Sequence, residues 1–262
     1  MIKIIIITGI VLVVVYIVAA VGIVLAQRQL IYPVPSRSNE DCEREIADEV
    51  VTRNNTKLYH QHQEGSDTVV VFYHGNGDIA CDKVDLIDIF NEKNISYIFT
   101  EYEGYNHDGK KATNEGVLKS VEDTIEFINE QGYEHVYVIG QSIGTGAAAY
   151  HASIQPPERL LLISPFTTLT DVVSHMFPMY PRAFVEKFLD DRYNNVERLK
   201  DYKGKLIVVH GTKDPVVSDT YGQTLFQHIQ TDDKEFIEAK DYGHANIYPS
   251  EEVTQAVEKL VQ

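Results

Sequence analysis

The chain has 262 residues, a formal net charge of −16 at pH 7 and only two cysteines. Apart from an apolar N-terminus, its length suits one domain with a sizeable core. An acidic chain without clusters of Lys and Arg is not expected to bind nucleic acid or to adhere to anionic lipid through charge. Cys42 and Cys81 are too few for a disulfide framework or a four-ligand zinc site, so each is predicted to be a small buried or surface residue.

The first segment of the chain is a continuous apolar run. From Ile4 to Ala26 it consists almost entirely of Ile, Val, Leu and Ala. At about 1.5 Å per residue, a helix of this length spans the roughly 30 Å hydrocarbon core of a bilayer. Small residues near Ala26 also suit a signal-peptide cleavage site, but the run exceeds the roughly 7–15 residues of a signal core. We predict an uncleaved single-pass anchor over residues 1–27, and basic residues on both sides leave its orientation open.

A short tether is predicted over residues 28–47, because this stretch contains Pro33, Pro35 and many charges and lacks apolar periodicity. The globular domain is predicted over residues 48–262. It begins with two short strands that flank Asn54 and Asn55, and this arrangement is typical of a hairpin.

Strand-like and helix-like runs then alternate along the chain. Such alternation predicts an α/β fold with a mostly parallel central sheet and helices on both faces. We expect strands over 68–73, 95–101, 134–139, 160–163, 206–210 and 234–238, and helices over 79–91, 113–131, 145–150 and 251–260.

One connection is too long for an ordinary loop between strands. Residues 165–203 separate the strands at 160–163 and 206–210 and are rich in phenylalanine, tyrosine and methionine. A long apolar insertion near a catalytic edge is a lid candidate. Aromatic residues at helical spacing are equally typical of a packed crossover helix, so both interpretations stay open.

The most informative motif is Gly140-Gln141-Ser142-Ile143-Gly144, which lies between a predicted strand and a predicted helix. A Gly-x-Ser-x-Gly turn in this context presents its serine at the tip of a sharp bend. We expect that a Cβ at Gly140 or Gly144 would collide with neighbouring backbone. Ser142 is therefore the predicted nucleophile.

A serine hydroxyl is a weak nucleophile, so it requires a histidine to accept its proton and an acid to orient that histidine. Asp214 follows the strand at 206–210, and His244 follows the last predicted strand. The carboxyl ends of parallel strands share one edge of the sheet, which would place both residues beside Ser142. Their order along the chain, Ser then Asp then His, is that of α/β-hydrolases. We predict Asp214 as the acid and His244 as the base.

Acyl transfer also requires backbone N–H groups that point at the oxygen that becomes negative. The turn after the strand at 68–73 reads His74-Gly75-Asn76-Gly77 and supplies one such group. We predict the N–H groups of Asn76 and Ile143 as the oxyanion hole. His74 is expected to pack or hydrogen-bond within its own turn, because His244 already fills the role of base.

With these motifs, the chain resembles the α/β-hydrolases of the BEM46-like and ABHD13-like group, which are membrane-anchored serine hydrolases. The resemblance covers nearly the whole chain and implies a lipase- or esterase-like fold, with Ser142, Asp214 and His244 as nucleophile, acid and base. The matching segments are the anchor with Ile31-Tyr32-Pro33, His74-Gly75-Asn76-Gly77, Tyr102-Glu103-Gly104-Tyr105, the turn of Ser142, Ser164-Pro165-Phe166-Thr167-Thr168-Leu169, His210-Gly211-Thr212-Lys213-Asp214 and Gly243-His244.

One segment departs from the pattern of that group. Where the group usually has Asp-Tyr-Arg-Gly-Tyr-Gly-x-Ser, this chain has Glu101-Tyr102-Glu103-Gly104-Tyr105-Asn106-His107-Asp108. The loop is expected near the substrate pocket, where Glu103 would disfavour an anionic group.

The predicted function is hydrolysis of an ester or thioester through a covalent acyl-enzyme, which water resolves with His244 as base. The anchor would hold the enzyme close to lipid-like acyl substrates. The alternative is a serine peptidase of the prolyl-oligopeptidase or aminopeptidase kind, which needs an acidic or aromatic clamp for a peptide amine. A non-catalytic scaffold is disfavoured because the nucleophile, acid and base are all present. No phosphate loop, dinucleotide motif or metal-spaced set of His and Cys occurs, so no cofactor or metal is predicted.

Overall fold

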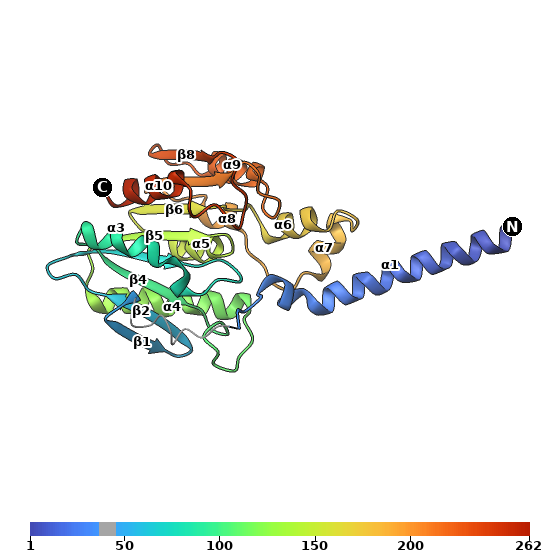
Figure 1. Cartoon of the computed structure of the whole chain (residues 1–262), viewed down its shortest axis with the longest axis horizontal. Helices are drawn as coiled ribbons and strands as arrows, with labels where there is room; N and C mark the ends of the chain where they lie inside the picture. The colour runs from blue at the N-terminus through green and yellow to red at the C-terminus, as the bar shows by residue number, and fades with distance from the viewer. Residues whose placement is uncertain (37–45) are drawn as a thin grey trace.

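An eight-stranded sheet organises the protein, and a long helix, α1, leaves one side of it (Figure 1). The computed structural model describes residues 1–36 and 46–262. The strand order is β1-β2-β4-β3-β5-β6-β7-β8. Strands β1 and β2 form the predicted hairpin, β2 pairs with β4 in the antiparallel sense, and the remaining pairs are parallel. The mostly parallel sheet inferred from the alternating runs is therefore confirmed.

The strands match the predicted runs to within two residues at most ends. Their bounds are β1 (Glu49–Arg53), β2 (Thr56–Gln61), β3 (Thr68–Tyr73), β4 (Ser96–Glu101), β5 (His135–Gln141), β6 (Arg159–Ile163), β7 (Lys205–Gly211) and β8 (Lys234–Ala239).

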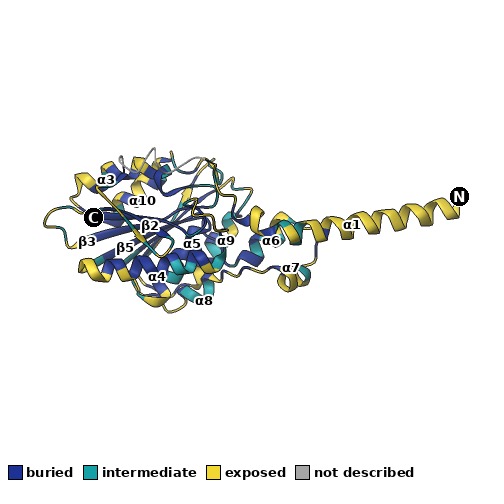
Figure 2. Ribbon diagram, turned by 90° about the horizontal axis from the view of Figure 1, so that it is seen from below, coloured by how far each residue is buried: buried dark blue, intermediate teal, exposed yellow. Residues whose placement is uncertain are grey.

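Helices cover both faces of the sheet because its central strands are apolar on both sides (Figure 2). In β3, for example, Val69 and Val71 belong to one core cluster, whereas Val70 and Phe72 belong to the other. The first cluster includes α4 (Asn114–Gln131), α5 (Gly144–Ile154), α8 (Asn195–Leu199) and α9 (Asp219–His228), and the second includes the 3-10 helix η2 (Ala80–Leu86), α3 (Ile87–Glu92) and α10 (Glu251–Val261).

Local signals explain where α4 begins and ends. The Thr113 side chain caps it by accepting a hydrogen bond from the Gly116 N–H, and Gly132 ends it in the left-handed region at a φ of 77°. The continuous helix expected over 79–91 is wrong in detail, since its first part is the 3-10 helix η2. The N–H of Ala80, the first residue of η2, has no partner within the helix and donates to the buried Glu101 carboxylate at 2.9 Å.

Cys81 is buried and disulfide-bonded, a pairing that the sequence did not predict. The second cysteine of the chain, Cys42, lies outside the described residues.

The helix α1 (Ile2–Ile31) extends past residue 27, where the anchor was expected to end. Its last turns pack on the domain, because Gln27, Ile31 and Tyr32 are buried. The predicted tether over 28–47 is therefore partly helical, and its residues 37–45 lie outside the described part of the chain. Among residues 1–36 and 46–262, α1 is the one helix long and apolar enough to cross a membrane.

The insertion over residues 165–203 contains α6 (Leu169–Met176), α7 (Arg182–Phe188) and α8. Both α6 and α7 project from the body of the domain beside α1 (Figure 1). The turned view shows the same arrangement (Figure 2). This part of the insertion is thus placed next to the apolar helix rather than over the sheet.

Candidate active site

Ser142 lies in a tight turn between β5 and α5. Its φ of 50° is a backbone angle that residues other than glycine rarely adopt. A Cβ on Gly140 would stand 2.6 Å from the Gly144 carbonyl oxygen. A Cβ on Gly144 would overlap the carbonyl oxygen of Tyr73 and stand 2.5 Å from that of His74. The collisions expected from the sequence are confirmed. The absence of a side chain at Gly140 allows the start of α5 to pack on β5, and its absence at Gly144 allows the turn of Ser142 to pack against the end of β3 and the turn after it.

The structure brings Ser142, His244 and Asp214 together at the carboxyl edge of the sheet. Ser142 Oγ is 2.8 Å from His244 Nε2, and His244 Nδ1 is 2.7 Å from Asp214 Oδ2. A carboxylate can only accept a hydrogen bond, so Nδ1 of His244 carries the hydrogen and Nε2 is free to accept the proton of the serine hydroxyl. This tautomer is assigned from the hydrogen-bond network. The three residues follow β5, β8 and β7, so the loops of three separate strands build the site.

Three hydrogen-bond donors hold Asp214 in place, and a buried histidine lies beside it. Its Oδ1 accepts hydrogen bonds from the N–H groups of Val216 and Val217 at 2.9 and 2.8 Å, and its Oδ2 lies 3.5 Å from His210 Nε2 in addition to its contact with His244. Burial opposes ionisation of this carboxyl, but the contacts with His210, His244 and the Val217 N–H outweigh it and hold the pKa of Asp214 well below its usual value. The Asp214 carboxylate is therefore ionised and oriented toward His244.

His210 is a residue of the site that sequence reasoning missed as a partner of Asp214. It is buried, and its Nε2 also lies 2.9 Å from the Val217 carbonyl oxygen. The spacing of four residues between His210 and Asp214 was the available signal, although it crosses a strand end where the side-chain directions cannot be read from the sequence.

A cavity of about 150 Å³ lies over Ser142, and the residues predicted as the oxyanion hole, Asn76 and Ile143, both line it. The Asn76 side chain donates to the carbonyl oxygen of Ile31 at 3.2 Å, which ties this turn to the end of α1. The sequence did not indicate that the apolar helix takes part in the cavity wall. The remaining lining residues are all apolar, namely Leu30, Ile31, Phe166, Leu169, Val172, Val173, Met176, Phe177, Val216 and Val217.

His74 directly follows β3, and its side chain is fully buried. Its Nε2 is 3.1 Å from Glu101 Oε1, and its Nδ1 is 2.8 Å from the Gly75 carbonyl oxygen. The backbone carbonyl oxygen of His74 accepts a hydrogen bond from Tyr102 Oη at 2.9 Å. Burial disfavours the charged imidazole, but the Glu101 carboxylate and the Gly75 carbonyl outweigh it and raise the pKa of His74 above its usual 6.5. His74 thus packs within its turn, as the sequence led us to expect.

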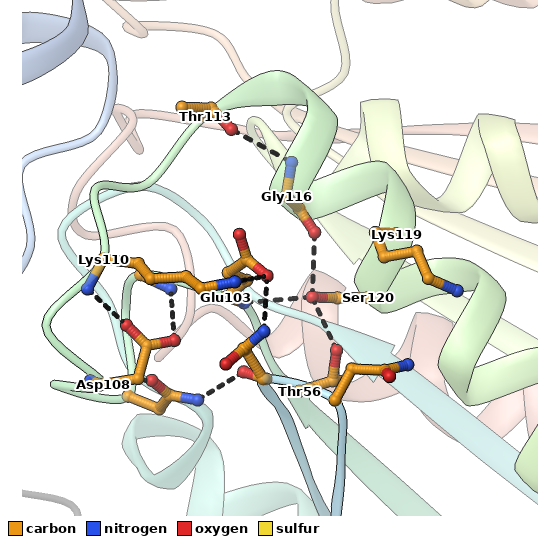
Figure 3. Close-up of polar contacts among 12 residues, drawn as sticks. Thr56, Glu103, Asp108, Lys110, Thr113, Gly116, Lys119 and Ser120 are labelled. Atoms are coloured by element: carbon orange, nitrogen blue, oxygen red, sulfur yellow. Dashed lines mark hydrogen bonds and ion pairs between the residues drawn. The ribbon is translucent and has the colours of Figure 1, made fainter.

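Glu103 does not line the cavity of Ser142, although its loop was expected near the substrate pocket. Its carboxylate accepts from Lys110 Nζ at 2.9 Å and from the Asn55 side chain at 3.0 Å, and its N–H donates to Ser120 Oγ at 3.0 Å. Figure 3 shows Glu103 enclosed by this polar cluster. The loop after β4 turns away from the cavity because these contacts hold it against α4 and the first hairpin.

Asp67, Glu134 and His135 form one exposed group whose ligand atoms lie within 4.8 Å of one another. They stand at the beginnings of β3 and β5, the edge of the sheet opposite to Ser142. His135 Nδ1 is 2.7 Å from Glu158, so an ion pair already accounts for its position. The group has no connection with the cavity.

Residues 64–196 match the model of the Hydrolase_4 family, described as serine aminopeptidase, S33. The chain belongs to this family. The α/β-hydrolase recognised from the sequence is thereby confirmed, and the relatives described next agree with the membership.

An uncharacterised protein of Mycobacterium tuberculosis is 27% identical over 231 residues, which are 83% of this chain and 80% of that protein. The lysophosphatidylserine lipase ABHD12 of Gallus gallus is 25% identical over 238 residues, or 80% of this chain. That match spans 62% of the length of the lipase.

Solved structures share the fold. An esterase of Pyrococcus furiosus superposes with a TM-score of 0.66 at 18% identity and covers 87% of this chain and 94% of its own. A monoacylglycerol lipase of Paleococcus ferrophilus gives a TM-score of 0.59 at 19% identity, with 81% of this chain and 98% of its own covered.

The buried pair of His74 and Glu101 predicts a specific dependence of stability on pH. Because the pKa of His74 is raised above 6.5, the stability from the pair is fully present below that pH and is lost as pH rises through the raised pKa. The loss of stability caused by Glu101→Gln should be largest in acid and shrink in alkali. Thermal unfolding of both proteins between about pH 5 and about pH 9 measures this. Glu103→Gln is the matched control, and a pH-independent effect of Glu101→Gln would contradict the prediction.

Proposed function

We propose that this protein is a membrane-anchored serine hydrolase that cleaves an ester or thioester of a lipid-like acyl group. The observation that carries the proposal is the hydrogen-bonded series from Ser142 through His244 to Asp214. This series ends in an apolar cavity that Asn76 and Ile143 also line. Acyl transfer requires a nucleophile, a base, an oriented acid and donors for the oxyanion, and the two residues proposed to supply those donors line the same cavity as Ser142.

In the proposed reaction, Ser142 Oγ attacks the acyl carbonyl carbon while His244 Nε2 accepts the hydroxyl proton. Asp214 stabilises the imidazolium that forms, and the N–H groups of Asn76 and Ile143 stabilise the negative oxygen of the tetrahedral intermediate. The alcohol or thiol leaves with the proton of His244. Water, deprotonated in turn by His244, then attacks the acyl-enzyme, and His244 returns the proton to Ser142 Oγ as the acid is released.

The cavity favours an acyl group over a peptide with a charged amine. Recognition of an amino terminus would be strongest with a carboxylate, and none lines the cavity among the described residues. Phe166 and Phe177 offer aromatic rings, but a ring alone attracts a cation more weakly than a buried carboxylate does. The family description as serine aminopeptidase keeps the peptidase as the second candidate. The lysophosphatidylserine lipase among the relatives supports the acyl ester.

We also propose that α1 remains part of the protein as its anchor. The helix continues without a break past Ala26 to Ile31, and its final residues Leu30 and Ile31 line the cavity of Ser142. Cleavage after Ala26 would cut this helix immediately before Gln27, which is buried against the domain. The hydrolase domain is accordingly proposed over residues 48–262, with the insertion at 165–203 as its candidate lid.

A fluorophosphonate probe should label wild-type protein at Ser142 and should fail to label Ser142→Ala, because the probe requires a nucleophilic serine beside a base. Ser153→Ala removes an exposed serine far from the cavity and is the matched control, which should be labelled like the wild type. Equal labelling of Ser142→Ala would remove the assignment of the nucleophile.

Asp214→Asn should lower kcat for a soluble ester by about 10⁴-fold, because the amide no longer holds His244 in the tautomer that accepts the serine proton. Asp241→Asn changes an exposed aspartate that pairs with Lys213 in the neighbouring loop, and it should keep nearly full activity. Steady-state kinetics of the two variants decide the matter. An active Asp214→Asn enzyme would show that another group serves as the acid.

Full-length protein should stay with membranes after washing with alkaline carbonate, which removes proteins held by charge but not a spanning helix. Sequencing of its N-terminus should begin before Ile4. A mature N-terminus at Gln27 would show that the segment is a cleaved signal.

A further inference from the structure

The turn that joins α6 to α7 lies against the middle of α1. Residues 176–181 form this turn, called here the α6–α7 tip. Tyr16 Oη donates to the Met179 carbonyl oxygen at 3.0 Å, and the rings of Tyr16 and Tyr180 are 4.9 Å apart. Nearer the domain, Gln27 Nε2 donates to the carbonyl oxygen of Phe188, the last residue of α7, at 3.3 Å. The pair α6–α7 therefore runs along α1 from Gln27 out to Tyr16 (Figure 1).

These contacts place the tip at a definite depth if α1 spans the membrane, as the proposed function requires. With Lys3 at the far boundary, about 20 residues of helix cross the hydrocarbon core, which then ends near Ile23. Tyr16 lies seven residues before Ile23, or about 10 Å inside that boundary at 1.5 Å per residue. Gln27 lies outside it, at the level of the lipid headgroups. The tip that touches Tyr16 must then share the depth of Tyr16.

The chemistry of the tip suits a hydrocarbon environment. Its sequence, Met-Phe-Pro-Met-Tyr-Pro, has no charged residue, and two of its side chains, Met176 and Met179, are 50% and 58% exposed. Exposed large apolar side chains next to one another are unusual on a surface that faces water. The first charge after the tip, Arg182, is ion-paired with Asp171 and Glu186, as a cation close to lipid is expected to be.

The apolar surface continues from the tip to the nucleophile. Val173 and Phe177 of the α6 region line the cavity of Ser142, and they also line a second cavity of about 40 Å³ between α1 and α6–α7. Ile23 of α1 and Tyr180 of the tip border this second cavity. The side chains that surround the nucleophile thus adjoin those at bilayer depth.

We propose that the α6–α7 tip is inserted in the hydrocarbon layer of the leaflet next to the domain, so that the cavity of Ser142 opens to the bilayer. The inference rests on the proposed function and names its substrate class, an ester whose acyl chain resides in the membrane. The acyl chain of the substrate passes from the leaflet between α1 and α6 without crossing water, and the ester carbonyl group thereby reaches Ser142. The occupant of the exposed tip is lipid, rather than a second copy of this chain or another protein.

Fluorescence can test the depth of the tip directly, because the chain contains no tryptophan. Met179→Trp places one on the tip, and Ile154→Trp is the control at an exposed apolar position at the end of α5, on the far edge of the sheet. Each full-length variant is reconstituted in phosphatidylcholine vesicles with bromines on the acyl chains. We expect strong quenching for Met179→Trp and none for Ile154→Trp. An unquenched Met179→Trp, whether exposed to water or covered by protein, overturns the inference.

A second measurement connects the tip with the reaction. Two hydrolysis rates are measured, one for a long-chain monoacyl ester in vesicles and one for a short water-soluble ester. Each rate is normalised to the amount of fluorophosphonate-reactive protein, and the first is divided by the second. Met179→Glu should lower this ratio about tenfold, because a charge at this depth opposes insertion of the tip. Ile154→Glu should leave it unchanged. An unchanged ratio in Met179→Glu contradicts the inference.

The two proposals fail in different ways. If Ser142 does not react and neither ester is cleaved, the proposed function fails, whereas quenching of Met179→Trp still measures the position of the tip. If the short ester is cleaved by Ser142 but Met179→Trp is not quenched, the hydrolase stands and the membrane-inserted tip is wrong.

Discussion

The close approach of two turns is the constraint on which the whole site depends. The turn of Ser142 packs directly on the turn after β3, and the absence of a side chain at Gly144 leaves room for the carbonyl oxygens of Tyr73 and His74. At any larger separation, Asn76 and Ile143 would no longer line one cavity with the nucleophile. The left-handed backbone of Ser142 is sustained by the same packing, since strain of this kind persists only where surrounding structure holds it.

Two histidine and carboxylate pairs lie on either side of this contact, and their exposure separates their roles. His74 and Glu101 are fully buried, so that pair has no route for exchanging a proton with a substrate and serves to hold the turn. His244 is 13% exposed while Asp214 is fully buried, so the imidazole can meet a substrate while its acid stays shielded from water. Of the two pairs, only the partly exposed one is proposed to take part in chemistry.

The apolar helix α1 has a structural role beyond attachment. The carbonyl oxygen of Ile31 accepts from the Asn76 side chain, and Leu30 and Ile31 form part of the wall over Ser142. At its middle, Tyr16 contacts the turn between α6 and α7. The same helix therefore touches both the turn that contains Asn76 and the turn between α6 and α7.

The sequence by itself determined the order of the strands, four of the helical segments and the residues at the carboxyl ends of β5, β7 and β8, because apolar periodicity, glycine turns and strand ends are local properties of a chain. From these it predicted Ser142, Asp214 and His244, which the structure places in hydrogen-bond contact. Tertiary structure alone decided that His210 adjoins Asp214, that Glu103 turns away from the cavity and that Met179 lies against Tyr16. The last of these contacts joins residues 163 positions apart, and no local pattern encodes how such distant segments pack.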